Sequence, residues 1–221
     1  MWMNVTNRRA IRASMLAAMA GALIAFSAEA AEQPKPATRN EIADAQPRTA
    51  YFRADSTPAK IPNVLLSKSD EAKCRLKVGD AMPDIKLPQL GDRGEKQLAD
   101  LYGETATVVV FWKGDRRMAL QQLADLGPDV VKPFAQNGVA VVGVAVSETP
   151  QNAEAVLKKH HADFPNLLDS GGEAFAQLGT GKLPRTYLLD PQGKILWFDI
   201  EYSLATRREL NRALRAVTGA E

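Results

Sequence analysis

Residues 183–195 read LPRTYLLDPQGKI, a stretch in which a short apolar strand runs into a tight turn. Residues 185–190 combine threonine, tyrosine and two leucines, and residues 191–194 contain the proline and glycine of a turn. The chain then resumes as a second apolar strand over 195–199. The stretch therefore predicts a β-hairpin.

Upstream of the hairpin, strands alternate with helices. Continuous valine-rich runs, typical of strands covered on both faces, occupy residues 107–112 and 139–146, and an alternating strand with its turn occupies 85–94. Helical spacing of apolar residues occurs over 116–136 (with a break near Gly127-Pro128), 150–161, 173–178 and 206–217. Thr206 and Glu209 are predicted to form the capping box of the last helix. This order predicts an α/β fold: a central mixed sheet, helices on both faces, and a C-terminal hairpin plus helix.

The amino terminus has the order of a secretory signal peptide over residues 1–30. Three arginines within 8–12 precede an apolar run over 15–26, and residues 28–30 (AEA) offer a signal-peptidase site. The arginines partly match a twin-arginine signal, and retention as an uncleaved anchor is the alternative to cleavage. We expect an exported protein of the periplasm or cell envelope, with no stable transmembrane span after cleavage.

Residues 31–77 carry several prolines and few large apolar side chains before residue 61, which predicts a linker. Within it, residues 61–66 are a possible edge strand. The folded domain is expected over 78–221.

Composition narrows the classes of function. The 221-residue chain is 45% hydrophobic and 24% charged, as globular proteins are. Its net charge of +2 comes from residues 1–30. The rest of the chain carries equal numbers of basic and acidic residues, which argues against nucleic-acid binding. A single cysteine excludes a disulfide framework within the chain and any multi-cysteine metal site. The adjacent His160 and His161 point apart on a helix, so they do not readily share a metal ion. We expect no metal and no cofactor.

The hairpin stretch resembles thioredoxin-like redoxins, in particular the exported TlpA type and the AhpC/TSA group. Residues 78–87 resemble the entry segment of this family, 108–112 the strand that leads to its active site, and 164–169 the segment before its penultimate helix. The resemblance covers about 78–218 and implies a thioredoxin-like fold. It also implies a cis proline at Pro184, which would leave the backbone of Leu183 free to pair with an extended substrate chain.

The sequence departs from the family at the catalytic motif. A Cys-x-x-Cys pair is expected at the start of the helix after residue 112, where backbone N–H groups and the helix dipole stabilise a thiolate. The two positions hold Arg116 and Ala119, and no cysteine occurs between residues 78 and 221. Neither the dithiol cycle nor the peroxidatic cysteine of the peroxiredoxins is available at this position.

The former active-site groove provides the candidate binding residues. Four cations are predicted to gather there, and with the helix N-terminus they could bind a carboxylate or a phosphate. The alternative is a solvated basic edge in which Asp115 caps the helix. The groove is assigned to Trp112, Lys113, Asp115, Arg116, Arg117, Leu183, Pro184 and Arg185.

Cys74 is the one candidate catalytic residue. Lys73, Arg75 and Lys77 flank it, and nearby cations can lower the pKa of a thiol. The alternative is an inert thiol, or one that pairs between chains. Two functions follow. The first is a redox-inactive protein that binds a polypeptide or an anionic group in the groove. The second is a monothiol thiol–disulfide oxidoreductase or peroxidase that uses Cys74 and an external reductant. The oligomeric state stays open.

Overall fold

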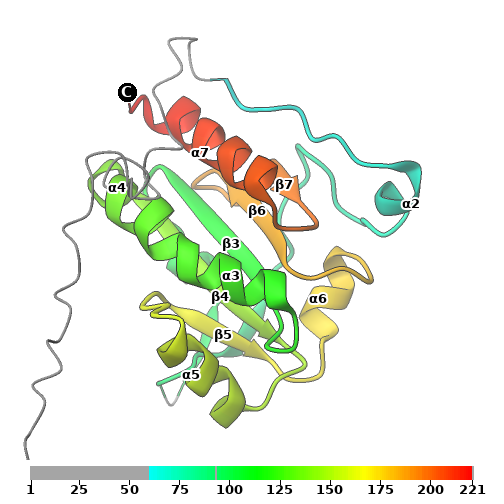
Figure 1. The fold of residues 1–221 in the computed structure, drawn as a ribbon, viewed down its shortest axis with the longest axis vertical. Helices are drawn as coiled ribbons and strands as arrows, with labels where there is room; N and C mark the ends of the chain where they lie inside the picture. Colours follow the sequence, from blue (N-terminus) through cyan, green and yellow to red (C-terminus); the bar gives the residue numbers. More distant parts are fainter. Residues whose placement is uncertain (1–59, 93, 221) are drawn as a thin grey trace, which may run out of the picture. The chain divides into compact units, whose positions relative to one another are not determined.

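The computed structural model describes residues 60–92 and 94–220, so the predicted signal peptide and most of the predicted linker lie outside the described residues. The main sheet has five strands in the order β5-β4-β3-β6-β7 (Figure 1). β3, β4 and β5 are parallel, whereas β6 is antiparallel to β3 and to β7. This confirms the predicted mixed sheet with a hairpin at one edge. The strands are β3 (Ala106–Trp112), β4 (Val139–Val146), β5 (Asn166–Asp169), β6 (Arg185–Leu189) and β7 (Ile195–Asp199).

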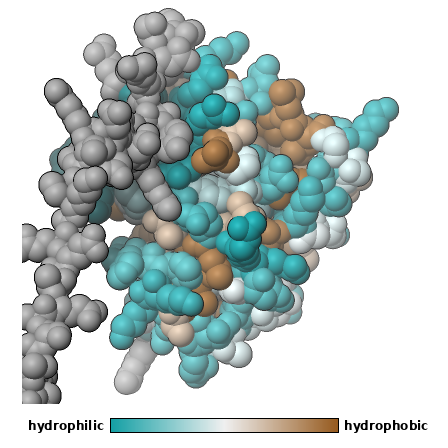
Figure 2. All heavy atoms as spheres, in the orientation of Figure 1, coloured by the Kyte–Doolittle hydropathy of each residue, from teal (hydrophilic) through white to brown (hydrophobic). Residues whose placement is uncertain are grey.

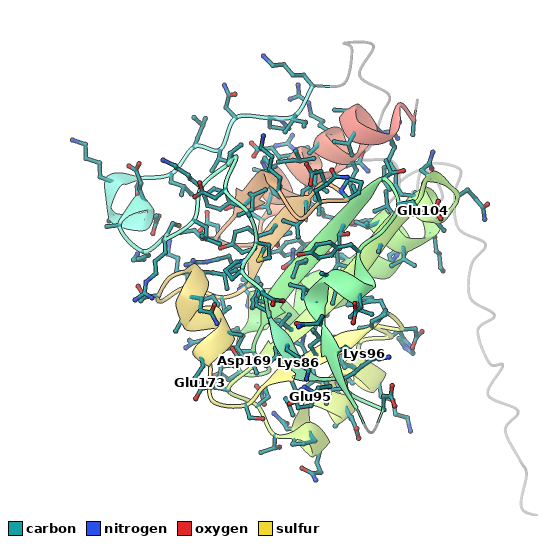
Figure 3. The ribbon with its side chains drawn as sticks, turned by 180° about the vertical axis from the view of Figure 1, so that it is seen from behind. Lys86, Glu95, Lys96, Glu104, Asp169 and Glu173 are labelled. Carbon is teal, nitrogen blue, oxygen red and sulfur yellow. The ribbon has the colours of Figure 1, made fainter. Side chains whose placement is uncertain are left out.

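Helices cover both faces of the sheet, as predicted. Three long helices share one apolar cluster with the first face: α3 (Arg117–Leu126), α5 (Pro150–Lys159) and α7 (Leu204–Thr218). The second face is covered by shorter elements: α6 (Glu173–Leu178), the hairpin of β1 (Lys86–Pro88) and β2 (Glu95–Gln97), and the 3-10 helix η2 (Leu98–Leu101). Figure 3 shows this second face, where Lys86 and Glu95 pair at 3.1 Å across the hairpin.

Side chains alternate between the two faces along each strand. On β3, Val108, Val110 and Trp112 join the cluster under α3 and α7, whereas Val109 and Phe111 join the cluster under α6. On β6, Leu188 belongs to the first cluster, and Tyr187 and Leu189 belong to the second. The face on which a candidate site residue of β3 or β6 lies follows from the same alternation.

The predicted break at Gly127-Pro128 is a change of helix type. α3 continues as a π-helical stretch, η3 (Gly127–Val131), then as α4 (Lys132–Phe134) and a final 3-10 turn, η4 (Ala135–Asn137). A proline at this point removes one backbone donor, and a π-helical stretch accommodates the resulting shift in hydrogen bonding.

The predicted capping box of the last helix is wrong. α7 begins earlier, because Ser203 is its cap and the Ser203 hydroxyl accepts a hydrogen bond from the Thr206 N–H at 3.2 Å. The side chain of Thr206 is instead buried, and its hydroxyl donates to Asp199 at 2.7 Å. Ser203 precedes the first apolar residue of the helix, which is the position that a cap requires.

Residues 60–77 lie against the domain. Residues 61–66 form no strand, which corrects the predicted edge strand, but Ile61 and Val64 pack against the first cluster and Leu66 and Leu76 against the second. A short helix, α2 (Lys68–Glu71), follows. Figure 2 shows a mostly hydrophilic face over α3 and α7, with hydrophobic surface toward the side of α2, and Leu65 is 88% exposed. No helix in the described ranges is both long enough and apolar enough to span a bilayer.

Candidate functional site

Three loops meet at one edge of the sheet. β3 and β4 are parallel and stay in register up to the pair Trp112–Ala145, so the chain leaves both strands at the same edge. β6 is antiparallel to β3 and begins with Arg185 opposite Phe111, so the residues just before Arg185 arrive at that edge too. Ligands of open α/β sheets bind outside the carboxyl ends of the parallel strands. This edge is therefore the candidate site.

The loop between β3 and α3 carries charges that pair with one another. The carboxylate of Asp115 lies 3.2 Å from Arg116 Nε and 3.8 Å from Lys113 Nζ. Arg116 is the cap residue of α3 and makes no side-chain capping hydrogen bond, so the prediction that Asp115 caps the helix is wrong. The carboxylate of Asp115 is directed at the two cations instead. Arg117 is the first residue of the helix and is exposed.

A buried carboxylate, that of Glu148, binds the backbone of the loop between β3 and α3. Glu148 follows β4 and is 9% exposed. Its Oε1 accepts a hydrogen bond from the Gly114 N–H at 2.7 Å, and its Oε2 accepts one from the Asn152 side chain. The preceding residue, Ser147, has a φ of 52°, in the left-handed region that few non-glycine residues adopt. Sequence reasoning missed Glu148; the available signal was its place two residues after a buried strand.

Trp112 lies in the core and not in a groove. It is fully buried in the cluster under α3 and α7. Its indole N–H donates to Asn166 Oδ1 at 3.0 Å, and Asn166 Nδ2 donates in turn to the Phe164 carbonyl at 2.8 Å. The assignment of Trp112 to the binding groove is therefore wrong, because as the last residue of β3 it still follows the alternation of the strand.

Leu183 and Pro184 enter β6 at the site. The peptide bond between them is cis. Pro184 is buried and Leu183 is half-buried. Within the described part of the chain, neither the N–H nor the C=O of Leu183 makes a backbone hydrogen bond. Leu183 thus presents a free donor and a free acceptor next to the β3–α3 loop.

Arg185 does not join Lys113, Arg116 and Arg117, which corrects the predicted four-cation cluster. Its neighbour Thr186 accepts a hydrogen bond from Gln122 of α3 at 2.7 Å, so Thr186 faces α3. Arg185 therefore points to the opposite face. There its guanidinium lies 5.1 Å from the ring centroid of Phe175 in α6. The cation that sequence reasoning placed in the groove is buried on the other side of the sheet.

Cys74 also lies on the side of α6. It is half-buried, forms an isolated antiparallel bridge with Gly179, and packs against the second cluster. Burial raises the pKa of its thiol, and among the surrounding cations Arg185 opposes that shift most strongly. The flanking Lys73 is held 2.8 Å from Asp70. Lys73 lowers the pKa of the thiol less than Arg185 does, so the cation that acts on Cys74 most is one that is distant in the sequence.

The comparison with known families decides the identity of the domain. A sequence model of the AhpC/TSA family matches residues 78–198. That segment contains β3, β4 and β6, the strands whose ends form the candidate site, together with β5 and all but the last residue of β7. The chain belongs to the AhpC/TSA family.

Curated relatives of this AhpC/TSA protein are named thiol-disulfide oxidoreductase ResA. The protein from Oceanobacillus iheyensis is 28% identical over 122 residues, which cover 54% of this chain and 62% of the relative. The protein from Geobacillus thermodenitrificans is 27% identical over 123 residues, which cover 56% of this chain and 69% of the relative. The chain thus spans about two thirds of the length of these relatives.

Solved structures share the thioredoxin-like fold of this AhpC/TSA domain. A thiol:disulfide interchange protein described as DsbE, from Chlorobium tepidum, superposes with a TM-score of 0.59 at 24% identity, over 65% of this chain and 99% of that one. The peroxidoxin BcpB from Mycobacterium tuberculosis superposes with a TM-score of 0.55 at 22% identity, over 66% of this chain and 99% of that one. At these identities the likeness shows the fold alone.

The edge that forms the candidate site carries no thiol. The start of α3 carries Arg116 and Ala119, and Ala119 is fully buried. Cys74, the one cysteine of the chain, lies outside the stretch that matches the family. Among the described residues, no three His, Cys, Asp or Glu side chains are grouped so that they could hold a metal ion.

Proposed function

We propose that this protein is an exported, redox-inactive AhpC/TSA-family member that binds an extended polypeptide along the Leu183–Pro184 segment. The observation that carries the proposal is the unpaired backbone of Leu183 beside a helix start that has no thiol. An extended chain can add to such a segment as a strand adds to a sheet edge, with backbone hydrogen bonds supplying affinity. No electron transfer is needed for this binding.

The charges of the loop favour a polypeptide over a small anion. Asp115 already pairs with Lys113 and Arg116, and the buried Glu148 adds a second carboxylate under the loop. An anion would compete with Asp115 for its two cations, and the charge of Glu148 would repel it. A polypeptide backbone is neutral and makes its hydrogen bonds to Leu183 instead.

The binding is tested with reduced, S-carboxymethylated α-lactalbumin, a permanently unfolded probe without free thiols. Amide hydrogen exchange is followed by NMR for the full chain with and without the probe. The Leu183 N–H exchanges rapidly in the free protein and at least tenfold more slowly with saturating probe, because it gains an acceptor.

Two alanine variants sharpen the binding test. Leu183→Ala removes a half-buried side chain at the segment and is expected to weaken probe binding several-fold. Leu65→Ala removes a leucine that is 88% exposed elsewhere and should leave binding unchanged. Equal affinities of both variants and wild type, together with unchanged exchange at Leu183, would reject the proposal.

Export is supported by the signal-like pattern of residues 1–30 and by a structural neighbour described as a secreted disulfide oxidoreductase of Mycobacterium tuberculosis. Expression of the whole chain in a diderm bacterium, followed by fractionation and amino-terminal sequencing, tests it. A periplasmic protein that begins at Ala31 is expected. A full-length chain in the cytoplasm contradicts export, and a full-length chain in the membrane fraction indicates a retained anchor.

A monothiol enzyme based on Cys74 is the second candidate function. Arg185 favours it, because its charge opposes the rise in the pKa of the Cys74 thiol that burial causes. The test is the reduction of a protein disulfide by dithiothreitol in the presence of wild type or Cys74→Ser. Both proteins at the uncatalysed rate agree with the first proposal. A rate above that baseline that is lost in Cys74→Ser establishes the enzyme and overturns redox inactivity.

A further inference from the structure

A small cavity lies between α3, η3 and α7. Gln122 and Asp125 of α3, Val130 of η3 and Leu210 of α7 are among the residues that line it. Its volume open to a water-sized sphere is about 10 Å³, which is close to the room that a single water molecule needs. Cavities that stay empty are lined by apolar groups, whereas this lining includes an amide and carboxylates.

Gln122 brings an unpaired acceptor to this cavity. Its side chain is 0% exposed. Its Nε2 donates to the Thr186 hydroxyl at 2.7 Å, whereas its Oε1 accepts no hydrogen bond from any described residue. A buried carbonyl oxygen without a donor loses its hydration and gains nothing in return, so such atoms are nearly always paired. Gln122 Oε1 therefore calls for a small donor in the cavity.

Asp125 offers a second acceptor on the same side of α3. It lies three residues after Gln122, so the two side chains are neighbours on the helix, and both line the cavity. Asp125 Oδ2 accepts hydrogen bonds from the Tyr202 hydroxyl at 2.7 Å and from the Gln121 side chain at 3.0 Å. The same oxygen lies 3.4 Å from Arg207 Nη1. These contacts leave Asp125 Oδ1 for a further donor.

The charges around the cavity favour a neutral donor over a cation. Arg207 contacts Asp125 and also donates to both carboxylate oxygens of Asp129. All three of these side chains line the cavity, so the guanidinium lies there between two carboxylates and would repel a second cation. A water molecule supplies two donors and no charge, which matches the two acceptors of α3.

We propose that this cavity is a binding site for one internal water molecule, which donates to Gln122 Oε1 and to Asp125 Oδ1. The water fixes the Gln122 amide in the orientation in which Nε2 donates to Thr186, the second residue of β6. Gln122 is thereby a positioning residue for the start of β6, two residues after Pro184. The water site does not depend on whether a polypeptide binds at Leu183.

The bound water is counted by oxygen-17 relaxation dispersion of the solvent, which detects water molecules held longer than the protein takes to tumble. Val130 lines the cavity and is 3% exposed, so Val130→Ile places an added carbon where the water would lie. The full chain with Val130→Ile should hold one long-lived water fewer than the wild type. Val131→Ile is the matched control, since Val131 is half-buried outside the cavity lining, and it should leave the count unchanged.

The thermal midpoint of the same variants has opposite signs for a wet and a dry cavity. Val130→Ile should lower the midpoint by about 3 °C, because two buried acceptors lose their shared donor. Filling a dry cavity would instead raise the midpoint, because the added carbon gains contacts.

Gln122→Met separates the loss of the water from crowding. Methionine has a similar length and no amide acceptor, so in this background Val130→Ile should lower the midpoint by less than about 1 °C. Crowding alone would lower it equally in both backgrounds. An equal loss in both backgrounds, a higher midpoint in Val130→Ile than in the wild type, or an unchanged count of bound water would each overturn the proposal.

Discussion

The site edge and the region around Cys74 differ in which of their polar groups have partners. At the edge, the side chains of Asp115 and Glu148 are paired and a backbone, that of Leu183, is free. Around Cys74 the backbones are paired across the bridge to Gly179, and the buried guanidinium of Arg185 donates to the carbonyls of Leu178 and Thr180. The first region is the one that we propose binds an extended chain. The second region holds two segments that are distant in the sequence against each other.

The largest expected loss of stability comes from a substitution in the region around Cys74. Gly179 has a φ of 155°, and a Cβ there would overlap with the Lys73 carbonyl and Arg185 Nη1. Gly179→Ala should lower the free energy of unfolding by about 3 kcal/mol or more, because it forces apart the bridge and the buried guanidinium. Urea unfolding measures this. Gly94→Ala is the control, since nothing lies within 4 Å of its added Cβ; equal losses in the two variants would contradict the prediction.

The next largest loss of stability is expected from a substitution at the site edge. Glu148→Ala leaves the Gly114 N–H and the Asn152 side chain without their acceptor, and should cost about 2 kcal/mol of unfolding free energy. The loop should also lose protection at the Gly114 amide in hydrogen exchange. Glu154→Ala, at an exposed position of α5, should be nearly neutral. Unchanged exchange at Gly114 in Glu148→Ala would show that this carboxylate does not hold the loop.

A smaller effect reports the burial of Tyr187. Burial raises the pKa of Tyr187 to about 12, whereas an unfolded tyrosine titrates near 10. Between these values the unfolded chain loses a proton that the folded chain keeps, so the contribution to stability is complete below pH 10 and is lost as the pH rises toward 12. Relative to wild type, Tyr187→Phe should become more stable by about 1.4 kcal/mol between pH 9 and pH 11. A difference in unfolding free energy that is the same at both pH values would contradict this.

The smallest effect concerns the charges of the loop. Arg116 is 59% exposed at its side chain and pairs with Asp115, so Arg116→Ala should change the unfolding free energy by less than about 0.5 kcal/mol. Equilibrium dialysis should find no binding of inorganic phosphate by either protein. Phosphate binding that disappears in Arg116→Ala would restore the anion interpretation of this edge.

The sequence predicts the elements with strong periodicity and misses those without it. The valine runs of β3 and β4 are long and unambiguous, and the hairpin of β6 and β7 is marked by its turn. β2, with the sequence EKQ, has no apolar pattern, and β5 has only four residues. Both depend on pairing with neighbouring strands for their conformation, which one sequence does not display.

The sequence predicts where the candidate site lies, but not how all of its side chains are arranged. The edge itself follows from the order of strands, and Lys113, Arg116 and Leu183 lie there. Arg185 was misassigned because the alternation of β6 sends its side chain to the face opposite Thr186. Glu148 escaped notice because a single carboxylate matches no motif until the fold brings Gly114 to it.

The bridge between Cys74 and Gly179 also has a consequence for the order of folding. The two partners are separated by most of the domain, including β3, β4 and β5. Contacts between such distant positions form slowly, because a long loop must close before they are made. During synthesis, residues 73–75 leave the ribosome well before residues 178–180. The segment of residues 73–75 therefore pairs with residues 178–180 late in folding. Until then, the Cys74 thiol is at its most accessible to other molecules.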